Sequence, residues 1–268
     1  MKACAFDYER ARDVGEAVRL LSTDGAKLAA GMQSLGPMLN LRLVQPALLV
    51  DIRLLDELRS VREEGDTLAI GACVTHAEIE DGRVPGPAGA FLRKVASRIA
   101  YRAVRNRGTI GGSLALADPA ADWPSALALL GGIAIVAGPS GRREIPLDRF
   151  VTGLFSTGLA SGEIVVSIRL QKLGSKARFG WWKFCRKAGE FAQAIGGALE
   201  DRERGLARAV IGATSGAPFV ETGRRLFEKP DLDSCLAVAD KAGLTDDAYS
   251  RRLHAVALKR ALADAQAP

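Results

Sequence analysis

The sequence contains few of the residues from which metal centres are built. Its cysteines, Cys4, Cys73, Cys185 and Cys235, lie far apart, and no two of them form a C-x-x-C pair. Zinc sites and iron–sulfur clusters need several ligands at short spacing, so this distribution argues against either kind of site built from this chain alone. Scattered thiols are typical of a reducing compartment. We therefore expect a cytoplasmic protein without a metal site of its own.

Long apolar runs and basic blocks are also missing. The first ten residues, M-K-A-C-A-F-D-Y-E-R, contain no apolar segment of signal-peptide length, and no run approaches the length of a membrane span. The net charge of +6 is spread along the chain, which gives little support to a nucleic-acid arm or a membrane-binding helix. The sequence predicts a soluble, intracellular protein with no nucleic-acid partner and no membrane span, whose positive field suits an anionic cofactor.

Catalytic constellations are absent as well. No Ser/His/Asp or Cys/His arrangement has supporting spacing, and no G-x-G-x-x-G motif follows the first expected strand, which argues against a Rossmann fold. His76 has no nucleophile or metal-ligand partner nearby in sequence, so we interpret it as a first-turn helix residue close to a loop. The sequence therefore predicts no catalytic residue on this chain.

Length and hydrophobic periodicity predict several packed units. A chain of 268 residues with a hydrophobic fraction of 48% is enough for two or three of them. Residues 1–54 are expected to form a first lobe and residues 55–173 a second, followed by a polar joint near Gln171–Ala177. Residues 177–268, with three expected strands and then two helices, predict an α+β domain.

The expected elements follow from alternation, helical spacing and turn residues. In the first lobe they are strands at Ala3–Tyr8, Lys27–Ala30 and Leu48–Ile52, and helices at Asp13–Leu21, with Asp13 expected as its N-cap, and near 36–42. In the second lobe they are a hairpin at Arg59–Glu63 and Thr67–Cys73, a helix from His76 capped by Thr75, helices at Phe91–Val104 and Trp123–Leu130, and strands at Ile133–Val136, Arg142–Ile145 and Glu163–Leu170. In the last domain they are strands at Trp181–Lys187, Ala194–Glu200 and Ala207–Ala213, and helices at Asp231–Ala242 and Asp246–Ala265.

Two glycine-containing segments are the clearest candidates for ligand binding. One of them, Thr109–Ser113, comes later in the chain and is called the second glycine segment. It is expected to open its backbone N–H groups to an anion, because glycines let the main chain approach a pyrophosphate. A tight turn between buried elements is the alternative for a bare Gly-Gly pair. The first glycine segment, Ala29–Leu35, offers the same chemistry from elsewhere in the chain. Two such segments favour one extended ligand held from two sides.

Several longer motifs support a family resemblance. The most specific are A-A-G-M-Q-S-L-G-P-M-L-N-L-R-L at 29–43, V-R-N-R-G-T-I-G-G-S-L-A at 104–115 and A-D-P-A-A-D-W-P at 117–124, supported by G-E-I-V-V-S-I-R-L at 162–170 and K-F-C-R-K-A-G-E-F-A at 183–192. With these motifs the chain resembles, over essentially its whole length, the flavin-binding medium subunits of molybdenum hydroxylases, the family of carbon monoxide dehydrogenase and bacterial xanthine dehydrogenases.

The resemblance implies a fold and a division into domains. The expected α+β fold is a two-lobed FAD-binding domain of the vanillyl-alcohol-oxidase (PCMH) type, followed by a smaller α+β C-terminal domain of the carbon monoxide dehydrogenase flavoprotein type. On this chain the FAD-binding domain falls at 1–173, with lobes of about 1–54 and 55–173, and the C-terminal domain at 177–268. The aromatic residues Phe179, Trp181 and Trp182 lie either near subunit contacts or in the core of that domain.

The resemblance also implies the residues that hold FAD. The first glycine segment wraps the pyrophosphate, the second completes the cradle, and Asp122 holds ribityl or neighbouring hydroxyls. Backbone near Ile164 and the Lys183 side chain lie close to the flavin, and Phe191 approaches its ring. The full set is Ala29, Ala30, Gly31, Met32, Gln33, Ser34, Leu35, Thr109, Ile110, Gly111, Gly112, Ser113, Asp122, Ile164, Lys183 and Phe191.

Three positions qualify this assignment. Asp122 is also a plausible N-cap for the helix Trp123–Leu130, and both roles stay open on sequence alone. Family members often have a second glycine where this chain has Met32, so a Cβ must be accommodated there and a glycine-only conformation is excluded. Leu116 stands where relatives often carry a polar residue. We expect both departures to adjust the surroundings of the flavin.

The function implied by the resemblance is electron transfer within a larger enzyme. FAD is expected to be non-covalent, because the histidine or cysteine linkage sites of covalent flavoproteins are missing near the glycine segments. Molybdopterin and [2Fe-2S] clusters are expected on partner subunits only, a large and a small subunit that complete a heterotrimer, usually doubled to a heterohexamer. The alternatives are a stand-alone FAD-dependent oxidoreductase acting on a small molecule, and a non-enzymatic binding module for a nucleotide-like anion.

Overall fold

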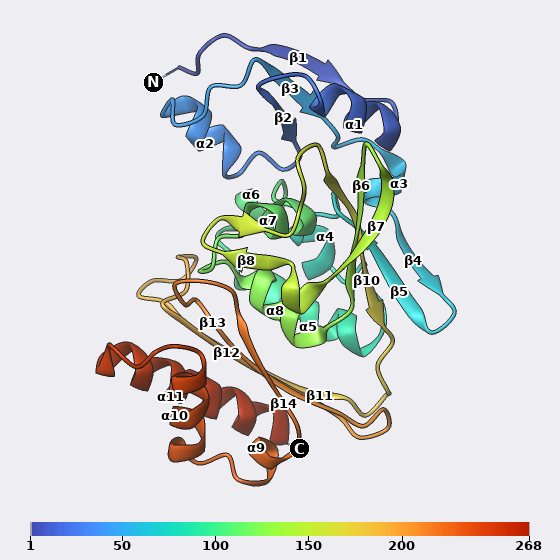
Figure 1. Cartoon of the computed structure of the whole chain (residues 1–268). Coiled ribbons are helices and arrows are strands. Elements are labelled where there is room, and N and C mark those ends of the chain that lie inside the picture. The colour runs from blue at the N-terminus through green and yellow to red at the C-terminus, as the bar shows by residue number, and fades with distance from the viewer. Residues whose placement is uncertain (1, 268) are drawn as a thin grey trace.

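Three main sheets follow one another along the chain in the computed structural model, which describes residues 2–267 (Figure 1). The first is a parallel sheet with strand order β1-β3-β2, and the second is an antiparallel sheet with order β4-β5-β10-β6-β7. The third is an antiparallel sheet with order β11-β12-β13-β14, covered on one face by the C-terminal helices. Helices and sheets pack together in each part, so the predicted α+β class is confirmed.

The N-terminal sheet is built from a compact strand, helix and strand arrangement. Its elements are β1 (Asp7–Arg10), α1 (Val14–Leu21), β2 (Ala26–Ala29), α2 (Leu35–Asn40) and β3 (Leu48–Asp51). Asp13 caps α1 as predicted, because its carboxylate accepts the backbone N–H of Glu16 at 2.7 Å. The apolar face of α1 then packs on β2 and β3.

The middle part holds the five-stranded sheet and the helices packed on it. Its elements are α3 (Asp56–Arg59), β4 (Val61–Glu64), β5 (Thr67–Gly71), α4 (His76–Glu80), α5 (Gly86–Ala96), α6 (Arg102–Arg105), α7 (Ile110–Leu116), α8 (Asp122–Leu130), β6 (Ile133–Gly138), β7 (Gly141–Pro146), the short helix η1 (Leu147–Arg149), β8 (Val151–Gly153), β9 (Ser156–Thr157) and β10 (Ile164–Gln171). Thr75 and Glu78 form a reciprocal capping box at the start of α4, so the expected cap is confirmed.

The C-terminal part packs a sheet against helices at unusually close range. Its elements are β11 (Arg178–Phe184), β12 (Ala194–Asp201), β13 (Leu206–Gly212), β14 (Phe219–Thr222), α9 (Arg225–Glu228), α10 (Leu232–Lys241) and α11 (Ala248–Gln266). A Cβ added at Gly180 would collide with the carbonyl of Ala261, and one added at Gly196 would collide with the backbone of Ala257 and Leu258. These two glycines therefore let α11 lie directly on β11 and β12.

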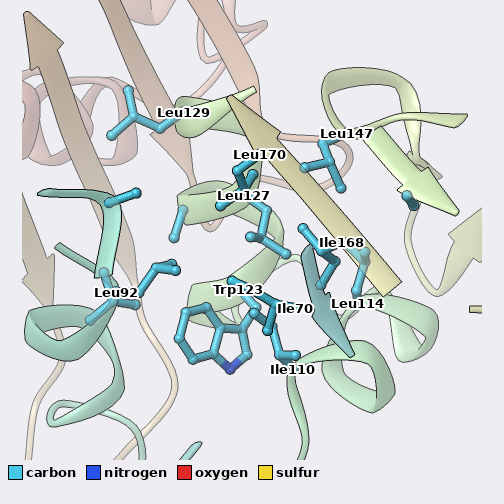
Figure 2. Packing of buried hydrophobic residues seen from close by; sticks show 14 of the residues in the cluster. Ile70, Leu92, Ile110, Leu114, Trp123, Leu127, Leu129, Leu147, Ile168 and Leu170 are labelled. Atoms are coloured by element: carbon cyan, nitrogen blue, oxygen red, sulfur yellow. The ribbon is translucent and has the colours of Figure 1, made fainter. Parts of the chain in front are cut away.

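One hydrophobic core joins the middle part to the C-terminal sheet. The helices α5, α7 and α8 fill the space against the five-stranded sheet, with Trp123, Ile110 and Leu127 completely buried (Figure 2). Trp181, Ile195 and other residues on the inner face of the C-terminal sheet belong to the same cluster. A shared apolar core of this kind holds the two parts at a fixed distance, since core side chains are close-packed.

The aromatic residues of β11 have their partners within the chain. Phe179 stacks on Phe91 of α5 with ring centroids 4.9 Å apart, and Trp181 packs edge-on against Phe91 at 5.6 Å. Trp182, on the opposite face of the strand, lies under the guanidinium of Arg260 at 4.6 Å. Packing within the chain, the second of the two roles considered for these aromatic residues, therefore accounts for their side chains.

Several expected elements were wrong in extent. The expected helix Phe91–Val104 is two helices, α5 and α6, separated by residues 97–101, where Ala100 has a left-handed φ of 40°. The first strand begins at Asp7 instead of Ala3, and the second glycine segment is mostly helix α7 instead of loop. The short elements α3, α9 and β14 had not been expected.

The close approach of α11 to the sheet predicts a packing-sensitive glycine. Gly196→Ala is expected to lower the free energy of unfolding by roughly 1–3 kcal/mol, because the new methyl group must displace helix backbone. Gly216→Ala is the matched control, since an added Cβ there would meet nothing within 4 Å, and is expected to change stability by less than about 0.5 kcal/mol. Urea unfolding measures both, and equal midpoints for the two variants would contradict the packing account.

Candidate functional site

A cavity of about 680 Å³ lies between the two glycine segments and is closed by residues of the C-terminal sheet. Its volume is in the range of small-molecule and cofactor sites. Thirteen of the sixteen residues expected at FAD line it: Ala30, Gly31, Met32, Gln33, Ser34, Leu35, Thr109, Gly111, Gly112, Ser113, Asp122, Lys183 and Phe191. The expected residues thus meet in space although the first and last of them, Ala30 and Phe191, are 161 positions apart.

Three expected residues do not line the cavity. Ala29, Ile110 and Ile164 are each buried, with Ile110 and Ile164 in the hydrophobic core clusters. Val165, the neighbour of Ile164 on β10, does line the cavity, as does Leu116 at the end of α7. The side chains of Ile110 and Ile164 therefore support the walls from behind.

The first glycine segment offers uncommitted backbone donors. Strand β2 ends at Ala29, and among the described residues the backbone N–H groups of Gly31–Ser34 donate to no protein acceptor. Met32 has a left-handed φ of 62°, a conformation that costs a non-glycine residue roughly 1–2 kcal/mol but is not restricted to glycine. Successive N–H groups around such a residue form a concave anion site. The Cβ of Met32 is thus accommodated by a conformation that also exposes donors.

The second glycine segment differs from the prediction in its hydrogen bonding. The N–H groups of Ile110 and Gly111 donate to the carbonyls of Val74 and Ala72 at 3.0 and 2.9 Å. Thr109 caps α7, accepting the N–H of Gly112 on its hydroxyl at 3.1 Å. The expectation that this run opens its N–H groups to an anion was wrong for residues 110–113, because the start of α7 is tied to the chain after β5 and each of these N–H groups has an acceptor within the protein. The N–H of Thr109 has no acceptor among the described residues, and Thr109, Gly111, Gly112 and Ser113 line the cavity.

The two segments also touch each other. A Cβ added at Gly31 would collide with the carbonyl of Arg107 and the Cα of Gly108. Gly108 immediately precedes the second glycine segment and itself lines the cavity. A side chain at Gly31 would therefore push the walls of the cavity apart, which is a steric reason for glycine at this position.

A buried ion pair forms the opposite wall. Lys183 on β11 donates to Asp122 on α8, with Nζ 2.7 Å from Oδ2, and each side chain is only 4% exposed. The other carboxylate oxygen, Oδ1 of Asp122, is buried and has no hydrogen-bond partner in the described part of the chain. Burial raises the pKa of Asp122, and the ammonium of Lys183 opposes that rise. The orphaned oxygen is an acceptor available to a ligand donor.

The alternative role of Asp122 as an N-cap is excluded by the helix geometry. Ala121 occupies the N-cap position of α8, and Asp122 is the first helical residue with no side-chain capping bond. Asp118, one turn earlier, accepts the backbone N–H of Ala120 at 2.9 Å and so shapes the turn before α8. The carboxylate of Asp122 is therefore directed to Lys183 and the cavity instead of to the helix backbone.

His76 lies in the cavity wall, which its spacing in sequence did not predict. Its side chain is 6% exposed, and its Nδ1 accepts the indole N–H of Trp123 at 2.9 Å. Burial, assisted by the positive charge of Arg105, lowers the pKa of His76 to about 3. The imidazole is consequently neutral at physiological pH. Sequence spacing missed this residue because its partner is 47 positions away.

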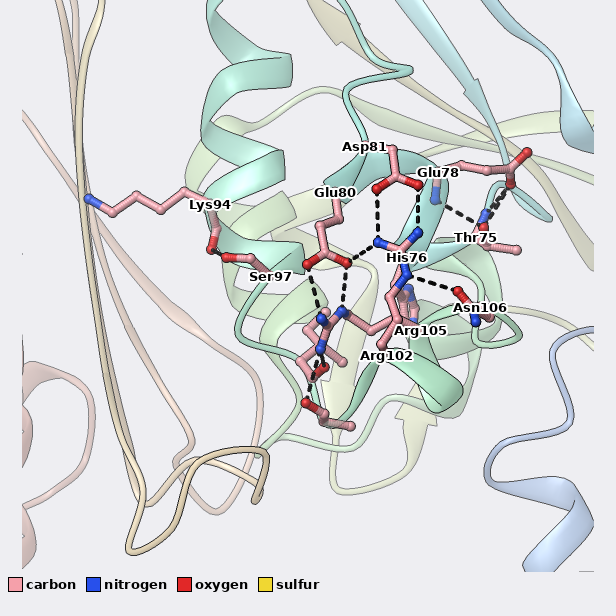
Figure 3. A network of polar contacts seen from close by, with 12 residues as sticks. Thr75, His76, Glu78, Glu80, Asp81, Lys94, Ser97, Arg102, Arg105 and Asn106 are labelled. Atoms are coloured by element: carbon pink, nitrogen blue, oxygen red, sulfur yellow. Dashed lines mark hydrogen bonds and ion pairs between the residues drawn. The ribbon is translucent and has the colours of Figure 1, made fainter.

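An arginine network fixes the segment that leads into the second glycine segment (Figure 3). Arg105 donates to both carboxylate oxygens of Glu80 at 2.8 and 2.9 Å, and its remaining nitrogen donates to the carbonyls of Ile99 and Ala100. Arg102 makes a second bidentate pair with Asp81. Bidentate pairs of this kind fix orientation as well as distance. Both acidic residues lie at the end of α4, so α4 and α6 hold each other in place.

Other reactive groups near the cavity are inert or exposed. Cys73 lines the cavity, but burial raises the pKa of its thiol to about 12, and its Sγ contacts the carbonyl of Ile52. The four cysteines are unpaired, and within residues 2–267 no group of three His, Cys, Asp or Glu side chains is arranged as metal ligands.

Phe191 stands at the mouth of the cavity and is 61% exposed. In the part of the chain that the structure describes, no helix has the length and apolar character to cross a membrane.

The environment of His76 predicts a pH dependence of stability. In the unfolded chain this histidine is protonated near pH 6.5, whereas in the folded protein it resists protonation down to about pH 3. The stabilisation that its shifted pKa contributes to the free energy of unfolding is therefore complete above pH 6.5 and declines below it. When the pH is lowered from 6.5 to 5, the free energy of unfolding of the wild-type protein is expected to fall by roughly 1.5 kcal/mol more than that of His76→Phe. Urea unfolding of the flavin-free chain at the two pH values measures the difference, and parallel losses in the two proteins would contradict it.

Comparisons with known proteins identify the family of this chain. A family profile described as the FAD binding domain in molybdopterin dehydrogenase matches residues 4–171. The chain is 36% identical to the carbon monoxide dehydrogenase medium chain of Hydrogenophaga pseudoflava, covering 96% of both chains. It is 39% identical to the 6-hydroxypseudooxynicotine dehydrogenase complex subunit alpha of Paenarthrobacter nicotinovorans, covering 90% of this chain and 83% of that subunit.

The similarity extends to the three-dimensional structure. The chain superposes with a TM-score of 0.87 on a structure of the Hydrogenophaga pseudoflava carbon monoxide dehydrogenase that lacks the Mo-pyranopterin moiety of its molybdenum cofactor. The match covers 99% of this chain and 98% of that one at 31% sequence identity. Profile, whole-length relatives and structure agree with the resemblance drawn from the motifs. The chain therefore belongs to the family of FAD-binding domain proteins of the molybdopterin dehydrogenases.

Proposed function

We propose that this chain is the FAD-binding subunit of a molybdenum-containing hydroxylase or dehydrogenase, and that it passes electrons from a partner iron–sulfur subunit through FAD to an external acceptor. The observation that carries the proposal is the cavity itself. One wall offers the uncommitted N–H groups of Gly31–Ser34, and the opposite wall offers the orphaned Oδ1 of Asp122. A ligand with an anionic group at one end would accept hydrogen bonds from these N–H groups, and hydroxyl groups at its other end would donate to this carboxylate oxygen.

FAD fits this donor and acceptor pattern. Its pyrophosphate would lie against the first glycine segment, where backbone N–H groups and the absence of a side chain at Gly31 favour an anion. A ribityl hydroxyl would donate to Asp122, and Lys183 would hold that carboxylate in position. Phe191 would approach the ring at the mouth of the cavity. We assign the sixteen expected residues to the site on this basis, with Ala29, Ile110 and Ile164 supporting it from the core.

The chemistry divides between the cofactor and the protein. When bound, FAD supplies an acceptor for two electrons that it can pass on singly or as a pair. The chain's own residues would bind and orient it: the first glycine segment holds its phosphates, Asp122 fixes its ribityl chain, and the apolar wall of Leu116 and Val165 excludes water. His76 is neutral and the Cys73 thiol is protonated, so neither is suited to proton transfer or nucleophilic attack at neutral pH.

The proposal includes partners and a division into domains. The relatives are medium chains and complex subunits by name, which supports a small iron–sulfur subunit and a large molybdopterin subunit as partners, in a dimer of heterotrimers. We assign residues 1–173 to the FAD-binding domain, with lobes of about 1–54 and 55–173, and residues 177–268 to the C-terminal domain. The separate, unpaired cysteines support a cytoplasmic location.

Co-expression with the genes of the two partner subunits tests the function. The expected product is a yellow complex whose organic substrate bleaches the flavin under anaerobic conditions, while the isolated chain with FAD shows no bleaching by the same substrate. The flavin is expected in the supernatant after acid precipitation, since it is held without a covalent bond. Bleaching by the isolated chain would establish the stand-alone oxidoreductase instead, and a colourless complex would contradict the flavin assignment.

The buried ion pair predicts separate effects on stability and on FAD affinity. Asp122→Ala is expected to weaken FAD binding about 10-fold, because the cofactor loses an acceptor, and to lower stability by about 3–5 kcal/mol, because the ammonium of Lys183 is left buried without a carboxylate partner. The double variant Asp122→Leu with Lys183→Met removes both charges. It is expected to recover most of the stability but not the affinity.

Thermal unfolding and FAD titration of the flavin-free proteins measure the two effects. The double variant is the control for a purely structural pair, because a structural role would let stability and affinity recover together. Wild-type affinity in Asp122→Ala, or full recovery of affinity in the double variant, would exclude Asp122 as a ligand.

A further inference from the structure

The hydrogen bond between Trp123 and His76 determines which ring nitrogen of the histidine carries the proton. An indole N–H can only donate, so Nδ1 of His76, at 2.9 Å, must be the acceptor. In a neutral imidazole the proton is then on Nε2. Trp123 is completely buried in the core, so its N–H cannot turn toward another acceptor. The protein therefore presents Nε2 of His76 as a fixed hydrogen-bond donor.

This donor has no acceptor in the part of the chain that the structure describes. The side chain of His76 is 94% buried and lines the cavity, and its Nε2 donates to none of residues 2–267. A Cβ added at Gly108 would lie 2.6 Å from Nε2, which places this atom beside the Gly108 backbone. Gly31 of the first glycine segment meets the same stretch of backbone. Nε2 is thus located where the two glycine segments touch.

We propose that Nε2–H of His76 is a positioning donor to a phosphate oxygen of the dinucleotide cofactor, and that Trp123 enforces the tautomer that makes this possible. The inference rests on the proposed function, since it assumes that FAD occupies the cavity. Nε2 is not among the fully enclosed side-chain atoms that lack a partner, so it can be reached from the cavity, and a ligand that fills the cavity must offer it an acceptor or leave it unpaired at a cost in free energy.

The distribution of donors around the cavity favours a phosphate oxygen as the acceptor. On the side of the first glycine segment, the N–H groups of Gly31–Ser34 are uncommitted. On the side of the second glycine segment, the N–H groups of Ile110, Gly111 and Gly112 already have acceptors within the protein. An anion at the contact between the segments therefore finds few donors on the second side: the backbone N–H of Thr109, which has no acceptor among the described residues, and the side chains that line the cavity, His76 among them.

The arginine network maintains this geometry without supplying the donor. His76 begins α4 and Glu80 ends it, so the bidentate pair of Glu80 with Arg105 fixes the helix that carries the histidine. The guanidinium of Arg105 is engaged by Glu80 and by the carbonyls of Ile99 and Ala100. Its positive charge also disfavours protonation of His76, which keeps Nδ1 available to the indole.

Three substitutions separate the cavity donor from the contact with Trp123. His76→Gln places an amide nitrogen near the position of Nε2, whereas His76→Asn keeps an acceptor near Nδ1 for Trp123 but does not reach the cavity. His76→Phe preserves the ring shape and removes both functions. The full-length chain, freed of flavin, is titrated with FAD and with riboflavin, which lacks phosphate, and fluorescence quenching gives the two dissociation constants.

The inference predicts at least about 10-fold weaker FAD binding for the Asn and Phe variants, a change within about 3-fold for the Gln variant, and unchanged riboflavin binding in all three. Wild-type FAD affinity in His76→Asn would overturn the inference and leave the histidine as an anchor for Trp123. Equal weakening of FAD and riboflavin would overturn the phosphate assignment. A wild-type chain that binds riboflavin and FAD equally weakly would instead contradict the proposed function itself.

Discussion

The buried ion pair between Asp122 and Lys183 is the interaction on which the rest of the site depends. Removing a carboxylate and an ammonium from water costs free energy that their attraction repays only when the geometry is good and the remaining polar atoms are satisfied. Here one carboxylate oxygen is left without a partner, in a wall of the cavity. A pair that serves stability alone would be better satisfied, so its incomplete hydrogen bonding points to a ligand.

The pair also connects the parts of the chain that form the cavity. Lys183 belongs to β11 in the C-terminal sheet, and Asp122 begins α8 in the middle part. The next residue, Trp123, donates to His76, and His76 lies against Gly108 where the glycine segments meet. The ion pair, the adjacent residues Asp122 and Trp123, and the Trp123–His76 hydrogen bond thus link β11 to the place where the glycine segments meet. Since the hydrophobic core beneath them is shared between the middle part and the C-terminal sheet, the walls are expected to move little relative to each other.

The sequence predicted the features that local interactions determine. The caps of α1 by Asp13 and of α4 by Thr75 depend on residues three positions apart, and both caps were predicted correctly. The long motifs identified the family, and with it the residues that gather around the cavity. Features set by distant partners were not predictable in this way. In the second glycine segment, the N–H groups of Ile110 and Gly111 donate to the carbonyls of Val74 and Ala72, and nothing within that segment indicates these partners.

His76 and Asp122 show that the roles of individual site residues were equally hard to predict from the sequence, because their partners are also distant along the chain. Spacing along the chain gave His76 no partner, because the residue that fixes its tautomer comes from α8 and is brought close only by the packing of α4 against the core. For Asp122 the sequence left two roles open, and the choice required the residue at which α8 begins and the contact with Lys183, which is 61 residues away. Both residues became interpretable when the cavity they share was described.

The central claim is that one cavity between the glycine segments holds FAD with its phosphates at the first segment and its ribityl chain at Asp122. A crystal structure of the FAD-loaded chain tests it most directly. The account predicts phosphate oxygens within about 3.2 Å of the backbone nitrogens of Gly31–Ser34, with a ribityl hydroxyl at the same range from Oδ1 of Asp122. FAD bound in the reverse orientation, or at another surface of the molecule, would contradict it.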